Sequence, residues 1–325
     1  MSGICGYIGI KRFAAETDII HRMCQSIIHR GPDEEGIWLG EGIAIGIRRL
    51  KIIDLVTGSQ PIFNEDKSIA IVFNGEIYNF HSLKKILQEK GHRFYTRTDT
   101  ETVVHSYEEW GEDFVQHFNG AFAFSIWDAK KEKLILVRDR IGEKPLYYTQ
   151  LPDGGLIWGS EIKAIFEHPS APIPEPDFTS IHHYLSLQYV PDPWSAFKNI
   201  RKLPPASILV FEKGATKIHR YWDLAFVPKH KESEQELSNE LLERLQTAVN
   251  CRLMGDVPLG VFLSGGIDSS IITALVARRC NEKIKTFSIG FEEDTFSELP
   301  FARAVAQHYD TEHHEFIVRY EAADI

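Results

Sequence analysis

Apolar and polar positions in the first half of the chain follow the short-period pattern of β-strands. Segments rich in β-branched and aromatic residues are separated by Gly, Asn and Asp, which are typical of turns. These segments predict strands within residues 39–54, 68–80, 120–128, 132–140 and 154–166. Apolar residues at helical spacing predict helices in 15–30 and 100–118. Strands and helices in such blocks predict a layered α+β domain with a sheet-on-sheet core over residues 1–165.

The pattern changes after residue 165. Residues 166–232 are irregular and rich in proline, so we expect an extension, a linker or a domain edge there. A helix is predicted at 233–254, and buried strands then alternate with helices. This alternation predicts a parallel α/β sheet within residues 233–325. About three strands with their helices are few for a doubly wound sheet, so the sequence predicts a second domain that is truncated at its carboxyl end.

Composition and charge narrow the class of protein. The chain has 325 residues and a formal net charge of −10, which argues against a broad nucleic-acid or membrane surface. Its 4 cysteines show no CxxC pair, so we expect a reducing compartment. No apolar run approaches the roughly 18 residues of a membrane span. We therefore expect a soluble, cytoplasmic protein without nucleic-acid or membrane partners.

The string SGGIDSS at 264–270 lies between a predicted strand and a predicted helix. Two glycines let backbone N–H groups face an anion, and the helix N-terminus and serine hydroxyls add donors. A bare SGG is equally an ordinary turn, and the lysine of a Walker A loop is missing. The full string resembles the PP-loop of ATP pyrophosphatases, which cleave ATP between the α and β phosphates and adenylate a substrate.

The PP-loop resemblance assigns roles to individual residues. Positions that hold pyrophosphate and its Mg²⁺ are matched by Ser264, Gly265, Gly266, Asp268 and Ser269. Positions that contact adenosine are matched by Leu263 and Ile289, although any buried strand also ends in such residues. Beyond the Mg²⁺ that accompanies ATP, we expect no metal site, because the 14 histidines contain no HExxH or comparable set.

Several short polar motifs in the first domain each have an ordinary structural explanation when taken alone. HRGPD, RRLKIID, NGEIYN and TDTE each suit a turn, a solvated pair or a helix cap. In this order, and followed by RDRIGEKPLYY and GSEIKA, they resemble the class II glutamine amidotransferase domain. That resemblance implies a four-layer αββα fold of the N-terminal-nucleophile hydrolases. Together with SGGIDSS, the chain resembles the glutamine-hydrolysing asparagine synthetase family.

The amidotransferase resemblance also implies a glutamine site. A guanidinium pairs well with the α-carboxylate, and carboxylates accept from the α-ammonium. Asn74 and Gly75 match the side-chain and backbone donors that stabilise the tetrahedral oxyanion. The substrate contacts are matched by Arg49 for the carboxylate, Glu76 and Asp99 for the ammonium, and Ile52 as a backbone contact.

The nucleophile can be placed in two registers. The family uses an amino-terminal cysteine, exposed by removal of the initiating methionine, whose own α-amino group is the base. Ser2-Gly3-Ile4-Cys5-Gly6 matches the family string except at the nucleophile, whereas Cys5 as nucleophile would require loss of four residues. We favour Ser2. A serine is a weaker nucleophile than a thiol, so glutaminase activity is either slow, lost in favour of free ammonia, or removed deliberately to trap glutamine.

The family resemblance implies ATP-dependent synthesis of asparagine. Ammonia from glutamine would displace AMP from β-aspartyl-AMP, formed from aspartate and MgATP, and a homodimer is expected by resemblance only. Two alternatives stay open. Cysteine-less relatives use ammonia directly or close amide rings, as β-lactam synthetases and lasso-peptide cyclases do, and a truncated chain could bind glutamine or nucleotide without turnover. The intact glutamine residues argue against ring closure, and we do not expect full synthetase activity from this chain alone.

Overall fold

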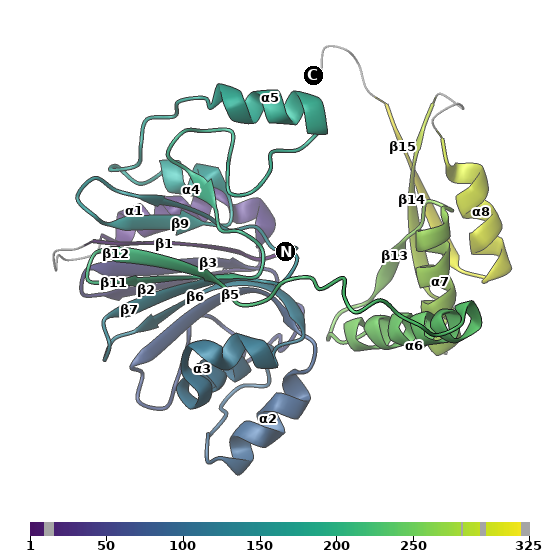
Figure 1. Cartoon of the computed structure of the whole chain (residues 1–325), viewed down its shortest axis with the longest axis horizontal. Coiled ribbons are helices and arrows are strands. Elements are labelled where there is room, and N and C mark those ends of the chain that lie inside the picture. The colour runs from purple at the N-terminus through teal and green to yellow at the C-terminus, as the bar shows by residue number, and fades with distance from the viewer. Residues whose placement is uncertain (10–15, 281, 293–296, 320–325) are drawn as a thin grey trace. The chain divides into compact units, whose positions relative to one another are not determined.

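The chain forms two compact units in the computed structural model, Met1–Phe226 and Val227–Ile325 (Figure 1). The structure describes residues 1–9, 16–280, 282–292 and 297–319. Residue 15 of the predicted helix 15–30 and the last six residues of the predicted second domain lie outside this described part.

The first unit contains two six-stranded sheets. Neighbouring strands within each sheet are antiparallel. The first sheet has the order β10-β8-β9-β1-β3-β2, with bounds β1 Gly3–Ile8, β2 Glu34–Gly40, β3 Ile43–Arg49, β8 Tyr147–Gln150, β9 Leu156–Gly159 and β10 Arg201–Lys202. The second has the order β12-β11-β7-β6-β5-β4, with bounds β4 Ile62–Phe63, β5 Ile69–Ile77, β6 Gly120–Asp128, β7 Lys133–Arg138, β11 Ser207–Glu212 and β12 Ala215–Arg220.

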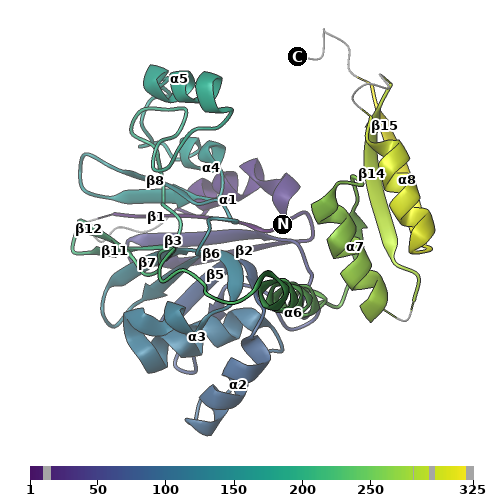
Figure 2. The ribbon, with the colours of Figure 1, turned by 45° about the vertical axis from the view of Figure 1, so that its right-hand side comes forward.

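The two sheets pack face to face between layers of helices. Ile45 and Ile47 of β3 share one buried cluster with Val72 of β5 and Leu136 of β7, because alternate residues of each strand point inward. Helices α1 (Thr17–Ser26) and α4 (Ile162–Phe166) cover the first sheet, and α3 (Asp99–Trp110) packs on the second, with α2 (Phe80–Glu89) beside it (Figures 1 and 2). The expected four-layer αββα architecture is confirmed.

Several segments differ from the elements expected from the sequence. No helix was predicted at α2, and two further differences affect the sheets. Within residues 166–232 lie α5 (Phe178–Leu187) and the strands β10 to β12, and β11 pairs with β7. Pro204 and Pro205, shortly before β11, favoured an irregular segment over this short apolar strand. The predicted strand 154–166 stops at Gly159, where Ser160 turns the chain by exchanging hydrogen bonds with Ile4, and α4 follows.

The second unit is a parallel α/β layer, as the strand–helix alternation predicts. Its three described strands have the order β13-β14-β15, and both pairs are parallel. Its elements are α6 Glu234–Arg252, β13 Gly260–Phe262, α7 Ile267–Arg279, β14 Lys285–Phe291, α8 Leu299–His308 and β15 Glu312–Val318. Helix α6 begins with a reciprocal capping box between Ser233 and Glu236. Nowhere in the described residues is there a helix long and apolar enough to cross a membrane.

Candidate functional site

A polar pocket that opens to solvent lies at the ends of β3 and β5. It is lined by Met1, Ser2, Arg49, Leu50, Ile52, Ile53, Gln60, Phe73, Asn74, Gly75, Glu76, Thr98, Asp99 and Thr100. Every residue that the sequence suggests for glutamine hydrolysis lines this pocket, with the exception of Cys5. Chain segments that are far apart in sequence therefore bring a serine hydroxyl, a cation, two carboxylates and amide donors together.

The cation of the pocket is held rigidly. Arg49 ends β3, and its side chain is 5% exposed. One arm of the guanidinium donates to the carbonyl oxygens of Ile53 (2.9 Å) and Asp54 (2.8 Å). The other arm pairs with Glu34 at 3.3 Å. These bonds fix the direction of the guanidinium, so that a carboxylate ligand would meet a pre-oriented donor.

Asn74 and Gly75 supply an amide-rich wall within β5. The Asn74 side chain is buried, and its Nδ2 has no hydrogen-bond partner among the described residues. An unpaired buried donor is costly unless a ligand accepts from it. Gly75 has φ +150°, and a Cβ there would lie 2.1 Å from the Ala121 carbonyl oxygen. Only glycine allows this backbone geometry beside the pocket.

Two carboxylates face the pocket in different ionisation environments. Burial raises the pKa of Asp99 to about 6, and the neighbouring Glu76 raises it as well, against hydrogen bonds donated by Ile77 N (2.8 Å) and Thr98 Oγ1 (3.0 Å). Glu76 is paired with Lys144 at 3.3 Å. An ammonium ligand beside Asp99 would favour its ionised form.

Lys144 reaches Glu76 because a tight turn after β7 places it there. The buried Asp139 carboxylate accepts from the backbone N–H groups of Phe122, Ile141, Glu143 and Lys144. This turn has the sequence RDRIGEKP, which is part of the family resemblance. The resemblance assigns no role to any of these residues. The structure identifies the role of the turn as the support of a Lys144–Glu76 pair at the pocket.

Gln60 is a further pocket residue that the sequence does not single out. Its side-chain amide pairs with the backbone of Phe73, accepting from the N–H (2.7 Å) and donating to the carbonyl oxygen (3.3 Å). It thereby occupies the backbone groups of β5 directly before Asn74. The Ser-Gln-Pro string around it gives no local signal for such a contact.

Ser2 lies at the pocket, one residue before β1. Its hydroxyl accepts a hydrogen bond from the Leu50 N–H (3.1 Å), and its carbonyl oxygen accepts from Arg30 Nε (3.0 Å). Burial, together with the cations Arg30 and Lys144, lowers the pKa of the Met1 amino group. An amine in this environment carries less positive charge near neutral pH than an ordinary terminus.

Cys5 lies in a different environment. It is fully buried in β1, opposite Gly46 and Gly159, and belongs to the cluster beneath α1. Its Sγ lies 3.6 Å from Cys24 Sγ. Burial raises the pKa of the Cys5 thiol well above its usual value, and the Cys24 contact raises it too. The structure therefore does not bring Cys5 to the pocket.

The glycine turn of the second unit lies between β13 and α7. Ser264 Oγ and Ser269 Oγ are 3.0 Å apart, and Gly266 N donates to Ser264 Oγ (3.3 Å). Gly265 has φ +85°, and a Cβ there would lie 2.4 Å from Ala302 N. Gly266 is the N-cap of α7, and Asp268 lies in the first turn of that helix. The turn thus places serine hydroxyls at the N-terminus of a 13-residue helix. An anion is stabilised at such a position.

The two predicted adenosine contacts differ in exposure. Leu263 is buried, and its N–H donates to the Phe287 carbonyl oxygen (2.8 Å). Ile289 is 56% exposed on the neighbouring strand β14.

Each of the two units matches a known protein family. Residues 1–222 match the family model described as "Glutamine amidotransferase domain", and residues 240–324 match "Asparagine synthase". Asparagine synthetase [glutamine-hydrolyzing] 3 of Bacillus subtilis is 36% identical over 98% of this chain and 54% of its own length. The enzyme numbered 1 of the same organism is 37% identical over 93% and 48%. The chain spans about half the length of these curated relatives.

Solved structures support the fold. The chain superposes on glutamine phosphoribosylpyrophosphate amidotransferase from B. subtilis with a TM-score of 0.51 and 16% identity, covering 99% of this chain and 69% of the other. At that identity the likeness shows the fold alone. With the family match over residues 1–222, the chain belongs to the glutamine amidotransferase domain family, and it carries a match to the asparagine synthase family in its second unit.

Proposed function

We propose that the chain binds glutamine in the pocket of its first unit and serves ATP-dependent asparagine synthesis. The observation that carries the proposal is the set of groups in the pocket. A fixed guanidinium, two carboxylates and an unpaired buried amide donor match the charged ends and the reacting carbonyl of one glutamine molecule. The names of the relatives supply the second half of the reaction.

Each group of the pocket has a task in this account. Arg49 pairs with the α-carboxylate of glutamine, while Asp99 and Glu76 accept from its α-ammonium. The side-chain amide then extends toward Ser2. When the carbonyl carbon is attacked, its oxygen gains negative charge, which Asn74 Nδ2 and the Gly75 N–H stabilise. The unpaired state of Asn74 Nδ2 in the ligand-free chain supports this role.

Residue 2 is the proposed nucleophile. Removal of Met1 would leave the Ser2 amino group among Arg30 and Lys144, which lower the pKa of the terminal amine in the unprocessed chain. That amine accepts the hydroxyl proton as oxygen attacks the amide carbon, and it then passes this proton to the amide nitrogen, which leaves as ammonia. Water then hydrolyses the resulting ester to glutamate. Cys5 is less suited, because its thiol is buried and outside the pocket.

The glycine turn is the proposed site for the pyrophosphate part of ATP. Its serine hydroxyls are 3.0 Å apart and partly exposed, and the missing Cβ of Gly265 permits close backbone packing. These features fit phosphate oxygens with Mg²⁺, whose charge would offset that of the phosphates. Ser264, Gly266, Asp268 and Ser269 would hold this group, and Ile289 would contact the adenosine. Aspartate activated as β-aspartyl-AMP would then accept ammonia.

A second candidate function is supported by Ser2 itself. Because a hydroxyl attacks more slowly than a thiolate, the chain would retain glutamine binding while free ammonia supplies the nitrogen. The alternative function of closing amide rings is disfavoured, because the residues proposed to contact glutamine are all present. We further propose a cytoplasmic location and a homodimer, on the basis of the family resemblance.

Ammonia release from glutamine tests the proposal. The wild-type chain is compared with Ser2→Cys, which restores a thiol at the pocket, and with Ser2→Cys combined with Asn74→Ala. We expect faster release by Ser2→Cys than by wild type, and a loss of about 10²–10³-fold when the oxyanion donor is removed. The proposal fails if Ser2→Cys binds no glutamine. Bound glutamine without ammonia release from any of these proteins would favour the ammonia-dependent alternative.

A further inference from the structure

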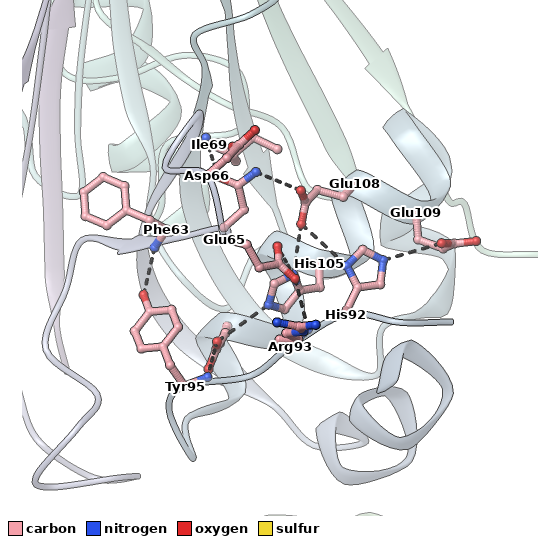
Figure 3. A network of polar contacts seen from close by, with 12 residues as sticks. Phe63, Glu65, Asp66, Ile69, His92, Arg93, Tyr95, His105, Glu108 and Glu109 are labelled. Carbon is pink, nitrogen blue, oxygen red and sulfur yellow. Dashed lines mark hydrogen bonds and ion pairs between the residues drawn. The ribbon is translucent and has the colours of Figure 1, made fainter. Parts of the chain in front are cut away.

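Two histidines and two glutamates converge beside helix α3, and none of the four lines the pocket described above. We call Glu65, His92, His105 and Glu108 the histidine–glutamate cluster. Glu65 follows β4, His92 follows α2, and His105 and Glu108 lie one turn apart on α3. One nitrogen or oxygen from each of the four residues lies within 4.8 Å of the others. Figure 3 shows the four side chains turned toward a common point.

The spacing of these atoms suits a small divalent metal ion. His105 Nδ1 lies 2.9 Å from Glu108 Oε2 and 3.7 Å from Glu65 Oε2. His92 Nδ1 lies 3.7 Å from the same Glu108 oxygen. Tetrahedral zinc with bonds of 2.0–2.2 Å separates its ligand atoms by about 3.4 Å. These three distances lie on either side of that value, and all four atoms lie within 4.8 Å of one another.

Both glutamates are oriented so that one oxygen is left for the cluster. Glu65 Oε1 accepts from the backbone N–H of Arg93 (2.9 Å), while Oε2 faces His105. Glu108 Oε1 accepts from Asn64 Nδ2 (2.8 Å), while Oε2 faces the two histidines. The carboxylates are therefore held at their outer oxygens, as metal-binding carboxylates commonly are.

The histidines are oriented in the same manner. Each presents Nδ1 to the cluster and turns Nε2 toward a further carboxylate. His105 Nε2 lies 3.6 Å from Glu101 Oε1, and His92 Nε2 lies 3.5 Å from Glu109 Oε2 (Figure 3). A carboxylate behind the second ring nitrogen is the usual outer partner of a metal-binding histidine, because it fixes the tautomer and the ring direction.

The charge around the cluster calls for a cation. Glu65, Glu101 and Glu108 form no ion pair with a lysine or arginine among the described residues; their partners are the two histidines. His105 and Glu101 are fully buried, and Glu101 also accepts hydrogen bonds from the backbone of Tyr95 and from the backbone and hydroxyl of Thr96. A dication held by two neutral imidazoles and two carboxylates compensates this charge more fully than protonation of one ring does.

We propose that the histidine–glutamate cluster is a zinc site, which joins the turn after β4 and the segment after α2 to helix α3. Four protein ligands leave no open position, so the site is structural. Helix α3 begins at Asp99, which lines the glutamine pocket. Zinc would thus stabilise the helix that presents Asp99, without contacting glutamine.

Metal analysis of the purified full chain tests this proposal independently of glutamine chemistry. The chain is stripped with a chelator, incubated with ZnCl₂, desalted and analysed for bound zinc, and its affinity is measured by competition with a chromogenic chelator. The variants are His92→Gln and Glu65→Gln, whose side chains are not buried. His21→Gln is the matched control, since it breaks an exposed His–Glu pair of 2.9 Å outside the cluster. Circular dichroism checks the folding of each protein.

We expect one zinc per wild-type chain and per His21→Gln chain. Each cluster variant should bind more than about tenfold more weakly, since even the loss of an outer partner costs 10–100-fold. Cobalt in place of zinc should give the visible absorption bands of a tetrahedral site in wild type. The proposal is wrong if the folded wild type retains no zinc, or if the cluster variants bind zinc as tightly as His21→Gln.

Discussion

The glutamine pocket and the glycine turn are built on different physical principles. In the pocket, Arg49, Asn74 and Asp99 are each no more than 4% exposed when the whole residue is counted. Contacts between distant parts of the chain hold them. In the turn, Ser264 and Gly266 are exposed, and their bonds join residues at most five positions apart. The fold thus holds the polar groups of the pocket in fixed positions, whereas the groups of the turn depend on local geometry at a helix N-terminus.

This difference indicates how each site should respond to substitution. A buried and fixed group contributes strongly, because its removal leaves partners unpaired in a medium of low dielectric constant. An exposed donor can be replaced in part by water. Substitutions in the pocket should therefore affect ligand affinity sharply, and those in the turn should matter most where the backbone itself is constrained.

Arg49→Ala should have the largest effect on ligand binding. Loss of a buried charge-assisted pair should weaken glutamine binding by about 100-fold, or roughly 3 kcal/mol. Arg48→Ala is the matched control, because Arg48 directly precedes Arg49, is also buried, and lies outside the pocket. Calorimetric titration with glutamine measures both variants. Equal affinities in two folded variants would contradict the assignment of Arg49.

Two neighbouring glycines of the turn should differ in their effect on stability. Gly265→Ala forces a side chain into φ +85° and to within 2.4 Å of Ala302 N, so it should lower the free energy of unfolding by about 2–3 kcal/mol. Gly266→Ala has φ −68° and meets Ser264 Oγ at 3.4 Å, its closest neighbour, so it should cost less than about 0.5 kcal/mol. Urea denaturation, monitored by a signal from the second unit, measures the free energy of unfolding of both variants. Equal decreases would show that the turn is not constrained at Gly265.

The ionisation of Asp99 should produce the smallest effect. Burial raises its pKa to about 6 in the ligand-free chain, so the carboxyl becomes neutral as the pH falls below that value. A neutral carboxyl no longer attracts the ammonium, and glutamine affinity at pH 5 should be about tenfold weaker than at pH 7. Titrations of wild type and Asp99→Asn across this range measure the effect. A flat profile for wild type, or an identical fall in Asp99→Asn, would mean that Asp99 does not hold the ammonium.

Much of the fold could be predicted from the sequence because its signals are local. The β-branched and aromatic residues of β5 and β6 predict two strands, and SGGIDSS predicts the strand–turn–helix of the second unit. Strand β11 was missed, because Pro204 and Pro205 shortly precede its six residues, whose burial depends on pairing with β7. No local pattern within residues 207–212 reveals that partner.

The site was predictable to the extent that short strings carry a family resemblance. That resemblance names the side chains of the pocket but not their support. Lys144 and Gln60 act through contacts with Glu76 and Phe73, residues 68 and 13 positions away in sequence. The histidine–glutamate cluster was missed for a similar reason. Only His105 and Glu108 have a regular spacing, and His92 joins them through the fold.

The mass of the chain after incubation with diazo-oxo-norleucine, a glutamine-analogue electrophile, tests the central claim most directly. Wild type and Ser2→Cys are treated alike, and peptide mapping locates any adduct. We predict that both chains lack Met1 alone and that Ser2→Cys carries one adduct at residue 2, with Cys5 unmodified because it is fully buried. An adduct on Cys5, a chain that begins at Cys5, or an unmodified Ser2→Cys protein would contradict the account of the pocket.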